Sequence, residues 1–152
     1  MGIAIGCDEA GFRLKQIIIK LLQDSGQAVK DYGCYDEKPV LYPEVGHAVA
    51  CAVADGTHER GILICGTGIG MSIVANKFPG VRAALATDVF MATMAKEHNN
   101  ANILVLGGRV IEPAAARAMV VAWLDTEFAG GRHQARLDKI TALESELKIQ
   151  AL

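Results

Sequence analysis

Residues 61–72 read Gly-Ile-Leu-Ile-Cys-Gly-Thr-Gly-Ile-Gly-Met-Ser, an apolar run followed by a glycine-rich turn. Residues 61–65 are predicted to form a strand, because a short, continuously apolar run is typical of a sheet that is covered on both faces. The glycines then lead the chain into a helix predicted from about residue 70 to residue 77. A strand that passes through a tight turn into a helix is the repeating unit of parallel α/β folds.

Apolar runs and helical patterns alternate along the rest of the chain in the same way. The other predicted strands span residues 3–7, 28–32, 82–86 and 103–106. The other predicted helices span residues 12–25, 42–56, 88–98, 113–125 and 134–150, and Asp88 is the expected cap of one of them. Strands separated by helices imply right-handed crossovers. We therefore expect an α/β fold with a five-stranded parallel sheet, in a single domain over residues 1–152.

Composition limits the partners and the compartment. The net charge of −2 argues against a nucleic-acid binder, because no basic surplus exists to neutralise a phosphate polymer. No apolar run approaches the roughly 18 to 20 residues that span a bilayer, and the start of the chain is too poorly flanked for a signal peptide. We therefore expect a cytoplasmic protein without membrane contact. The cysteines, at 7, 34, 51 and 65, lack CxxC or zinc-finger spacing, so we expect free thiols and no metal.

The ligand site of a parallel α/β fold lies at the carboxyl ends of the strands, which selects residues 7–9, residues 65–70 and the segment after the fifth strand. A nucleotide-binding loop is disfavoured, because the spacing is GxGxG and no acidic ribose ligand ends the next strand. Cys65 instead precedes a turn whose N–H groups favour a thiolate and can hold an oxyanion. Cys65 is therefore a candidate base, with Thr67 as a further donor, and the alternative is an ordinary buried cysteine.

Asp8 and His98 each allow a structural or a catalytic role. Asp8 ends the first strand, where a carboxylate either caps the next helical turn or takes part in catalysis. His98 ends a helix, where an imidazole interacts favourably with the helix dipole. Because histidine titrates near neutrality, His98 is also suited to proton transfer.

Three arginines are candidate ligands for a small anion. Arg132 and Arg136 lie four residues apart at the start of the last helix, where two guanidinium groups on one face can bind one anion together. Cations at a helix start oppose the dipole, so this pair is mildly unfavourable without an anion. Arg109 follows the fifth strand. The alternative for each arginine is a solvated surface charge.

Several long motifs occur in an order that resembles a known family. They are Ile-Ala-Ile-Gly-Cys-Asp-Glu-Ala-Gly-Phe (3–12), the run at 61–72, Asn-Lys-Phe-Pro-Gly-Val-Arg-Ala-Ala-Leu (76–85), Lys-Glu-His-Asn-Asn-Ala-Asn (96–102) and Glu-Phe-Ala-Gly-Gly-Arg-His (127–133). From residue 3 to about residue 140 the chain resembles the ribose-5-phosphate isomerase B family, which includes the galactose-6-phosphate isomerase subunits. The resemblance implies a Rossmann-like, three-layer αβα domain. It also implies aldose–ketose isomerisation of a small sugar phosphate through a cis-enediolate, without a metal or other cofactor.

The resemblance further implies an assembly and a role for each matching residue. The assembly is a homodimer or a dimer of dimers, whose active sites contain residues of both chains, and we expect the last helix to pack on the partner. Cys65 matches the base that moves a proton between C1 and C2, and His98 matches the acid/base that opens the sugar ring. Thr67 and the loop amides match the cradle of the enediolate, whose members are Gly66, Gly68, Ile69 and Gly70. Asp8 and Asn99 match contacts to sugar hydroxyls, and Tyr42 lies in the Tyr-Pro turn of the family. The phosphate ligands of the family are matched by Arg109, Arg132 and Arg136, and Glu9 occupies a further substrate-binding position.

Two positions depart from the family pattern. The family usually has a histidine near the substrate's phosphate where this chain has Glu9, and a glutamate would repel a phosphate dianion unless it pairs with an arginine or turns away. Leu41 stands where an aspartate more often precedes Tyr42. We therefore expect retained chemistry on ribose 5-phosphate or, if these changes have moved the preference, on another pentose, a tetrose or a hexose phosphate.

Two other classes of function remain open. A binding module would hold a sugar phosphate without converting it, although a sensor has no need for Cys65, Thr67 and His98 together. A non-catalytic subunit would act only within a hetero-oligomer, as in the two-subunit galactose-6-phosphate enzymes.

Overall fold

A computed structural model describes residues 2–150, so residue 1 and residues 151–152 of the predicted domain lie outside the described part. The strands are β1 (Ile3–Cys7), β2 (Val29–Asp31), β3 (Arg60–Cys65), β4 (Ala83–Leu85) and β5 (Ile103–Gly107). The helices are α1 (Phe12–Asp24), α2 (Tyr42–Ala54), α3 (Ile69–Ala75), α4 (Val89–Glu97), α5 (Pro113–Asp125) and α6 (Arg132–Gln150), and a 3-10 turn, Glu9–Gly11, joins β1 to α1. Each predicted strand and helix is present, with ends that differ by a few residues. Within residues 2–150 no helix combines the length and apolar character that crossing a membrane requires.

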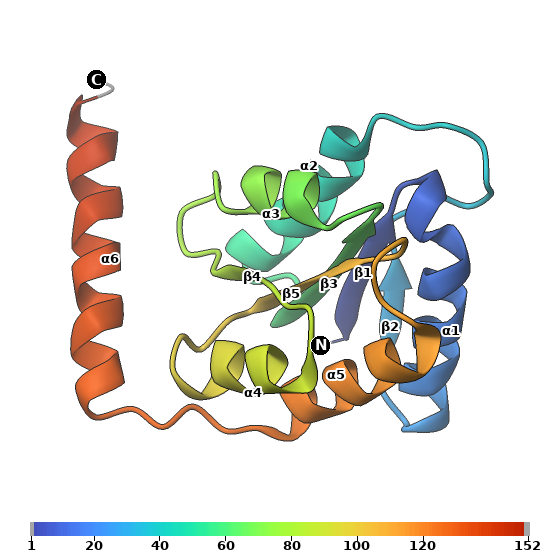
Figure 1. The fold of residues 1–152 in the computed structure, drawn as a ribbon. Helices are drawn as coiled ribbons and strands as arrows, with labels where there is room; N and C mark the ends of the chain where they lie inside the picture. The colour runs from blue at the N-terminus through green and yellow to red at the C-terminus, as the bar shows by residue number, and fades with distance from the viewer. Residues whose placement is uncertain (1, 151–152) are drawn as a thin grey trace.

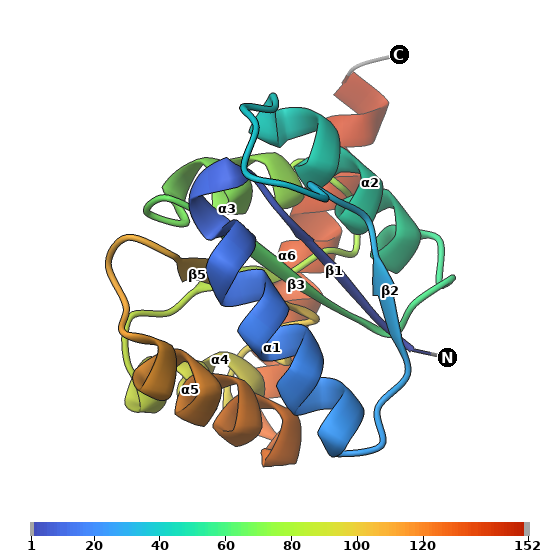
Figure 2. The ribbon, with the colours of Figure 1, turned by 90° about the vertical axis from the view of Figure 1, so that its right-hand side faces the viewer.

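The five strands form one parallel sheet in the order β2-β1-β3-β5-β4 (Figures 1 and 2), which confirms the predicted fold class. From β1 the chain first moves outward to β2 and then to β3 on the other side of β1. The direction of winding therefore reverses between β1 and β3, and ligands bind at such a switch point in open α/β sheets. The last two strands are exchanged relative to chain order, since β5 lies between β3 and β4.

Alternate residues of each strand pack against opposite helical layers. Ile62 and Ile64 of β3 belong to the apolar cluster that α1, α4 and α5 form around the buried Trp123. Leu63 and Cys65 belong to the cluster formed with α2 and α3. Both faces of β3 are therefore buried, as its continuous apolar sequence predicts. The Cys65 side chain consequently lies on the side of the sheet that α2 and α3 cover.

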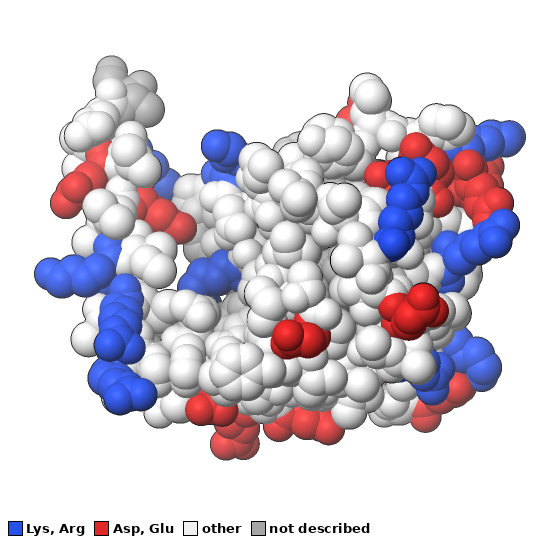
Figure 3. Space-filling view, in the orientation of Figure 1, with Lys and Arg blue, Asp and Glu red and all other residues white. Residues whose placement is uncertain are grey.

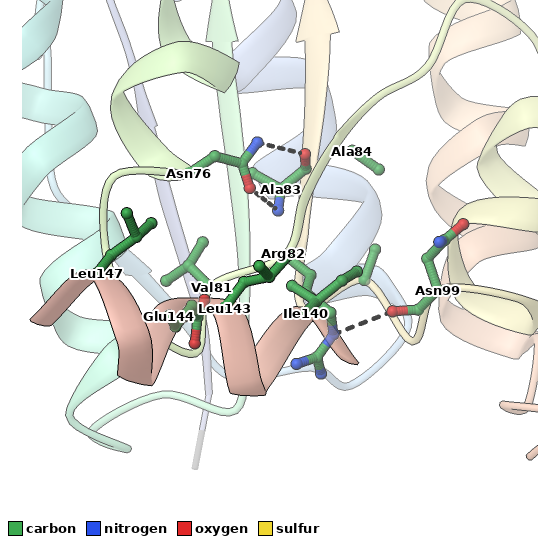
Figure 4. Close-up of a pocket in the computed structure, with 11 residues that line it drawn as sticks. Asn76, Val81, Arg82, Ala83, Ala84, Asn99, Ile140, Leu143, Glu144 and Leu147 are labelled. Atoms are coloured by element: carbon green, nitrogen blue, oxygen red, sulfur yellow. Dashed lines mark hydrogen bonds between the residues drawn. The ribbon is translucent and has the colours of Figure 1, made fainter. Parts of the chain in front are cut away.

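Helix α6 stands apart from both layers (Figure 1), and it begins at Arg132, two residues before its predicted start. It buries only His133 and Leu137 among its described side chains. Between α6 and the edge of the sheet at β4 lies a cavity of about 440 Å³ (Figure 4), and the gap beside the upper part of α6 is visible in Figure 3. On the α6 side this cavity is lined by Ile140, Leu143, Glu144 and Leu147. The helix therefore presents a largely apolar stripe that its own chain does not cover.

Candidate active site

The carboxyl ends of β1, β3 and β5 bring the three predicted segments together. Cys65 pairs with Gly107 in the sheet, and Ile64 pairs with Cys7. The residues that follow these three strands therefore lie together at the carboxyl-terminal end of the sheet. The backbone N–H of Arg109 donates to the Gly66 carbonyl at 2.9 Å, which joins the segment after β5 to the glycine-rich loop. These segments meet at the switch point between β1 and β3.

Cys65 is 5% exposed and lies directly under the glycine-rich loop. The backbone N–H of Gly68 donates to its Sγ at 3.2 Å. Gly68 has a φ of +83°, and a Cβ at this position would lie 2.5 Å from Cδ1 of Leu85, so the loop requires glycine there. The hydroxyl of Thr67 accepts the N–H of Ile69 at 3.3 Å, and Thr67 is exposed. The loop therefore points an N–H group at the thiol, as expected.

Tyr42, the first residue of α2, reaches the same loop from the other side. A Cβ on Gly70 would lie 2.7 Å from the Tyr42 ring and 2.9 Å from its hydroxyl oxygen, so the ring rests on this glycine. The absence of a side chain at residue 70 thus allows the phenol to approach the loop next to Cys65.

Asp8, Glu9 and Arg109 form the opposite side of this cluster. Asp8 Oδ1 accepts the N–H groups of Ala10 and Gly11 at 3.0 and 3.1 Å, so the capping role of Asp8 is confirmed for this oxygen. Burial raises the pKa of Asp8, and the Gly11 N–H and the Arg109 guanidinium act against this rise. The N–H groups of Glu9 itself and of Val40, together with Arg109, lower the pKa of Glu9.

The Glu9 carboxylate binds a backbone N–H group and, within residues 2–150, does not pair with an arginine side chain within 4 Å. Its Oε2 accepts the backbone N–H of Val40 at 3.2 Å. Among the described residues it forms no ion pair within 4 Å. One oxygen of this carboxylate is therefore directed at the Val40 N–H, in the segment before Tyr42.

His98 lies at the amino-terminal ends of the strands, whereas Cys65 lies at their carboxyl-terminal ends. It follows α4 and precedes β5, whose first residue, Ile103, pairs with Gly61 near the start of β3. Gly61 and Cys65 are separated by about 13 Å, because a strand advances by about 3.3 Å per residue. One chain therefore does not bring His98 and Cys65 into a single site.

A second cluster surrounds His98 at the amino-terminal ends of the strands. The ring of His98 stacks on that of His133, with 4.2 Å between centroids and 12° between planes. Burial lowers the pKa of His133, and His98, Arg132 and Arg136 lower it further. Both arginines are exposed, and neither forms an ion pair within 4 Å among the described residues. Asn99 is exposed as well, and its backbone carbonyl accepts Arg82 Nε at 3.0 Å (Figure 4).

His133 and Arg82 are the residues of this cluster that the sequence analysis missed as functional candidates. Arg82 donates to the Asn99 and Asn100 carbonyls and so fixes the turn that carries His98. His133 immediately follows Arg132 in the motif at residues 127–133. No local pattern indicates that it stacks on His98, which is 35 positions away. Only the fold brings these side chains together.

The candidate residues thus form two separate clusters, which we call the thiol half-site and the arginine half-site. The thiol half-site comprises Asp8, Tyr42, Cys65, Arg109 and the loop 66–70; the arginine half-site comprises His98, Asn99, Arg132, His133 and Arg136. A thiol beside inward N–H groups is suited to proton transfer next to a carbonyl, whose oxyanion the N–H groups stabilise. Two unpaired arginines on one helix face are suited to a phosphate. No group of three metal-binding side chains occurs within residues 2–150.

Comparison with known proteins defines the class and then the family. The protein is an isomerase that interconverts aldose and ketose sugar phosphates. Residues 3–140 match the family model described as Ribose/Galactose Isomerase, and the chain belongs to this family. The family that the motifs predicted is therefore confirmed.

Individual relatives match almost the whole chain. It is 44% identical to ribose-5-P isomerase B of Listeria innocua, over 96% of this chain and 99% of the relative. It is 48% identical to D-erythrulose-4-phosphate isomerase of Pectobacterium atrosepticum, over 99% of both chains. The structure of ribose-5-phosphate isomerase B from Clostridium thermocellum superposes with a TM-score of 0.95 at 48% identity, covering 97% of this chain and 99% of that one.

Proposed function

We propose that the protein isomerises a small phosphorylated sugar by proton transfer through Cys65, in a site that a second copy of the chain completes. The observation that carries this proposal is the separation of the two half-sites. Cys65 and His98 lie at opposite ends of the strands of one sheet, so a site that contains both residues needs a second chain. The homologous isomerases support the reaction type, and the thiol half-site supports the base.

The proposed chemical step is a proton transfer between neighbouring carbons. The Cys65 thiolate removes the proton from C2 of the aldose, and the electrons of the C–H bond form the double bond of a cis-enediolate. The thiol then returns the proton to C1, and the hydroxyl proton moves between O2 and O1, which gives the ketose. The Gly68 N–H, 3.2 Å from Sγ, supports the thiolate, and Thr67 with the loop amides stabilises the enediolate oxygen. The mechanism proposed therefore requires no metal.

The phosphate is assigned to the arginine half-site, with Arg109 completing its surroundings. Arg109 lies beside the carboxylates of Asp8 and Glu9, so that corner of the thiol half-site carries a net negative charge. Arg132 and Arg136 have no such compensation. A phosphate dianion that bridges the two half-sites would neutralise the positive charge of Arg132 and Arg136. It would also hold the sugar with its carbonyl end toward Cys65.

Helix α6 supplies the contact with the second copy. Its exposed apolar side chains include Ile140, Leu143 and Leu147, and the cavity beside them is open to a partner. Contiguous exposed apolar surface of this kind marks protein interfaces. Because Arg132 and Arg136 lie at the start of the same helix, packing of α6 on a partner carries these arginines toward the partner's thiol half-site. We propose a homodimer, or a dimer of dimers, on this basis.

The substrate is proposed to be ribose 5-phosphate or a shorter sugar phosphate. One comparison favours a tetrose 4-phosphate as the second candidate: a relative named D-erythrulose-4-phosphate isomerase is 48% identical. A tetrose 4-phosphate does not close a furanose ring, because its O4 is esterified. Such a substrate needs no ring opening and therefore no ring-opening role for His98.

Deuterium exchange tests the reaction and the substrate together. The purified chain is incubated in deuterated water with ribose 5-phosphate, erythrose 4-phosphate and a hexose 6-phosphate, and deuterium at C1 and C2 is followed. Cys65→Ala should abolish exchange with every sugar and leave ligand binding intact. His98→Asn should slow conversion of the ring-forming sugars only. Cys65→Ala activity within a few-fold of wild type would exclude this base, and no exchange by the wild-type chain would favour a binding or non-catalytic subunit.

A further inference from the structure

The segment that leads into Tyr42 is exposed along its whole length and held at few points. Residues 35–41 belong to no helix or strand, and each of them is exposed. Figure 2 shows the connection from β2 to α2 passing near the N-terminal end of α1. At its start it is anchored by the buried ammonium of Lys15, which donates to Asp31 at 2.6 and 2.8 Å and to the Cys34 carbonyl at 2.5 Å.

The first residues of the segment have local contacts: Cys34 Sγ donates to the Asp36 carbonyl at 3.2 Å, and the Tyr35 hydroxyl donates to the Asp31 carbonyl at 3.3 Å. Two further contacts tie the rest of the segment to residues 9–13. Arg13 pairs with Glu37 at 2.6 Å, but both side chains are more than half exposed, and such surface pairs contribute little. The other contact is the hydrogen bond from the Val40 N–H to Glu9 at 3.2 Å. Val40 is two residues before Tyr42, so Glu9 provides the last anchor before the active site.

Helix α2 lacks a capping side chain of its own at this end. Its N-cap residue is Leu41, which forms no side-chain hydrogen bond. The Glu44 N–H donates to the Leu41 carbonyl at 3.0 Å and Pro43 has no N–H, so backbone contacts alone close this turn and no side chain caps it. Since Tyr42 lies in this first turn, the position of its ring depends on how well residues 40 and 41 are held.

We propose that Glu9 is a positioning residue, which docks residues 35–41 onto the turn after β1 and thereby holds Tyr42 over Gly70. The proposal rests on the proposed function, because the position of Tyr42 matters to activity only if the loop 66–70 binds substrate. Glu9 acts here as a hydrogen-bond acceptor. It bears on substrate choice through the position of the Tyr42 hydroxyl, and its own carboxylate does not contact the substrate.

Limited proteolysis tests the docking without any reference to activity. A glutamate-specific protease cleaves after Glu37 when the segment is released, and mass spectrometry quantifies this fragment. Glu9→Leu should accelerate this cleavage about five-fold, as expected for the loss of one hydrogen bond. Glu9→Gln keeps an acceptor oxygen and should retain the wild-type rate. Glu44→Leu, which removes a negative charge from the first turn of α2 without removing a side-chain hydrogen bond, serves as the matched control and should also retain it.

Kinetics then test the connection to Tyr42. Glu9→Leu should raise KM about five-fold in the wild-type background and less than about two-fold in a Tyr42→Phe background, because the two residues act through one contact. Unchanged cleavage in Glu9→Leu, or cleavage of Glu9→Gln as fast as that of Glu9→Leu, would overturn the proposal. The proposal would also be overturned if Glu9→Leu raised KM by the same factor in the wild-type and the Tyr42→Phe backgrounds. If the chain proves inactive on every sugar phosphate, the proposed function fails while the cleavage assay still decides the docking.

Discussion

Mixing two inactive variants should restore about a quarter of the wild-type activity if, as we propose, each active site combines the thiol half-site of one chain with the arginine half-site of another. Cys65→Ala removes the proposed base of the thiol half-site. The double variant Arg132→Ala/Arg136→Ala removes the proposed phosphate ligands of the arginine half-site. In a mixed dimer one site receives both defects and the other receives neither. Random exchange makes about half of the dimers mixed, and one of their two sites is intact, which gives about one quarter of the sites.

The size of each single defect makes this recovery measurable. Each charge-assisted hydrogen bond contributes about 1.5–3 kcal/mol, so loss of both arginines should lower kcat/KM by at least about 100-fold. Loss of the proton-transferring thiol should lower it by about 100-fold or more. The background of either variant alone therefore stays near or below 1% of wild type, well under the expected recovery.

The assay uses two affinity tags and the deuterium-exchange rate. The variants are co-expressed, and mixed dimers are isolated through both tags. About half of the sites in this purified fraction should be intact, against about one quarter in the unfractionated mixture, and the activity is compared with that of each parent. A mixture of Cys65→Ala with Thr67→Ala is the control, because both defects fall in the thiol half-site and every mixed dimer then has one defect per site. Purified mixed dimers without activity, or equal recovery in the control, would refute the shared site.

Three further predictions concern single positions. Gly70→Ala places a methyl group 2.7 Å from the ring of Tyr42, which is partly exposed and free to move outward; kcat/KM should fall at least about ten-fold, while the melting temperature changes by less than about 3 °C. Burial lowers the pKa of His133 from its usual 6.5, so the unfolded chain binds the extra proton first and the stability of the wild type falls as pH drops below 6.5. In His133→Phe, urea midpoints at pH 5 and pH 8 should therefore differ less than in the wild type. Lys15→Met leaves the partly buried Asp31 carboxylate without its ammonium partner and should cost about 3 kcal/mol of unfolding free energy, part of which Asp31→Asn should restore.

Local sequence patterns determined the helices and the strands. They also determined the part of the thiol half-site that directly follows strand β3. Asp88 caps α4 by accepting the Met91 N–H at 2.7 Å, and α5 begins at Pro113, as predicted. The apolar run of residues 61–65 forms the central strand of the sheet, and the glycines after it place an N–H group against Cys65. These features depend on the conformational preferences and burial of neighbouring residues, which the sequence records directly.

The tertiary structure decided the order of the strands and the division of the site. Insertion of β5 between β3 and β4 depends on pairing between segments about 40 residues apart, which no local pattern records. The same pairing places His98 at the amino edge of the sheet, away from Cys65, although both belong to motifs that resemble one family. The direction of the Glu9 carboxylate likewise depends on Val40, 31 positions away. A sequence therefore specifies which groups are available for chemistry, and the long-range packing of the chain determines which of them share a site.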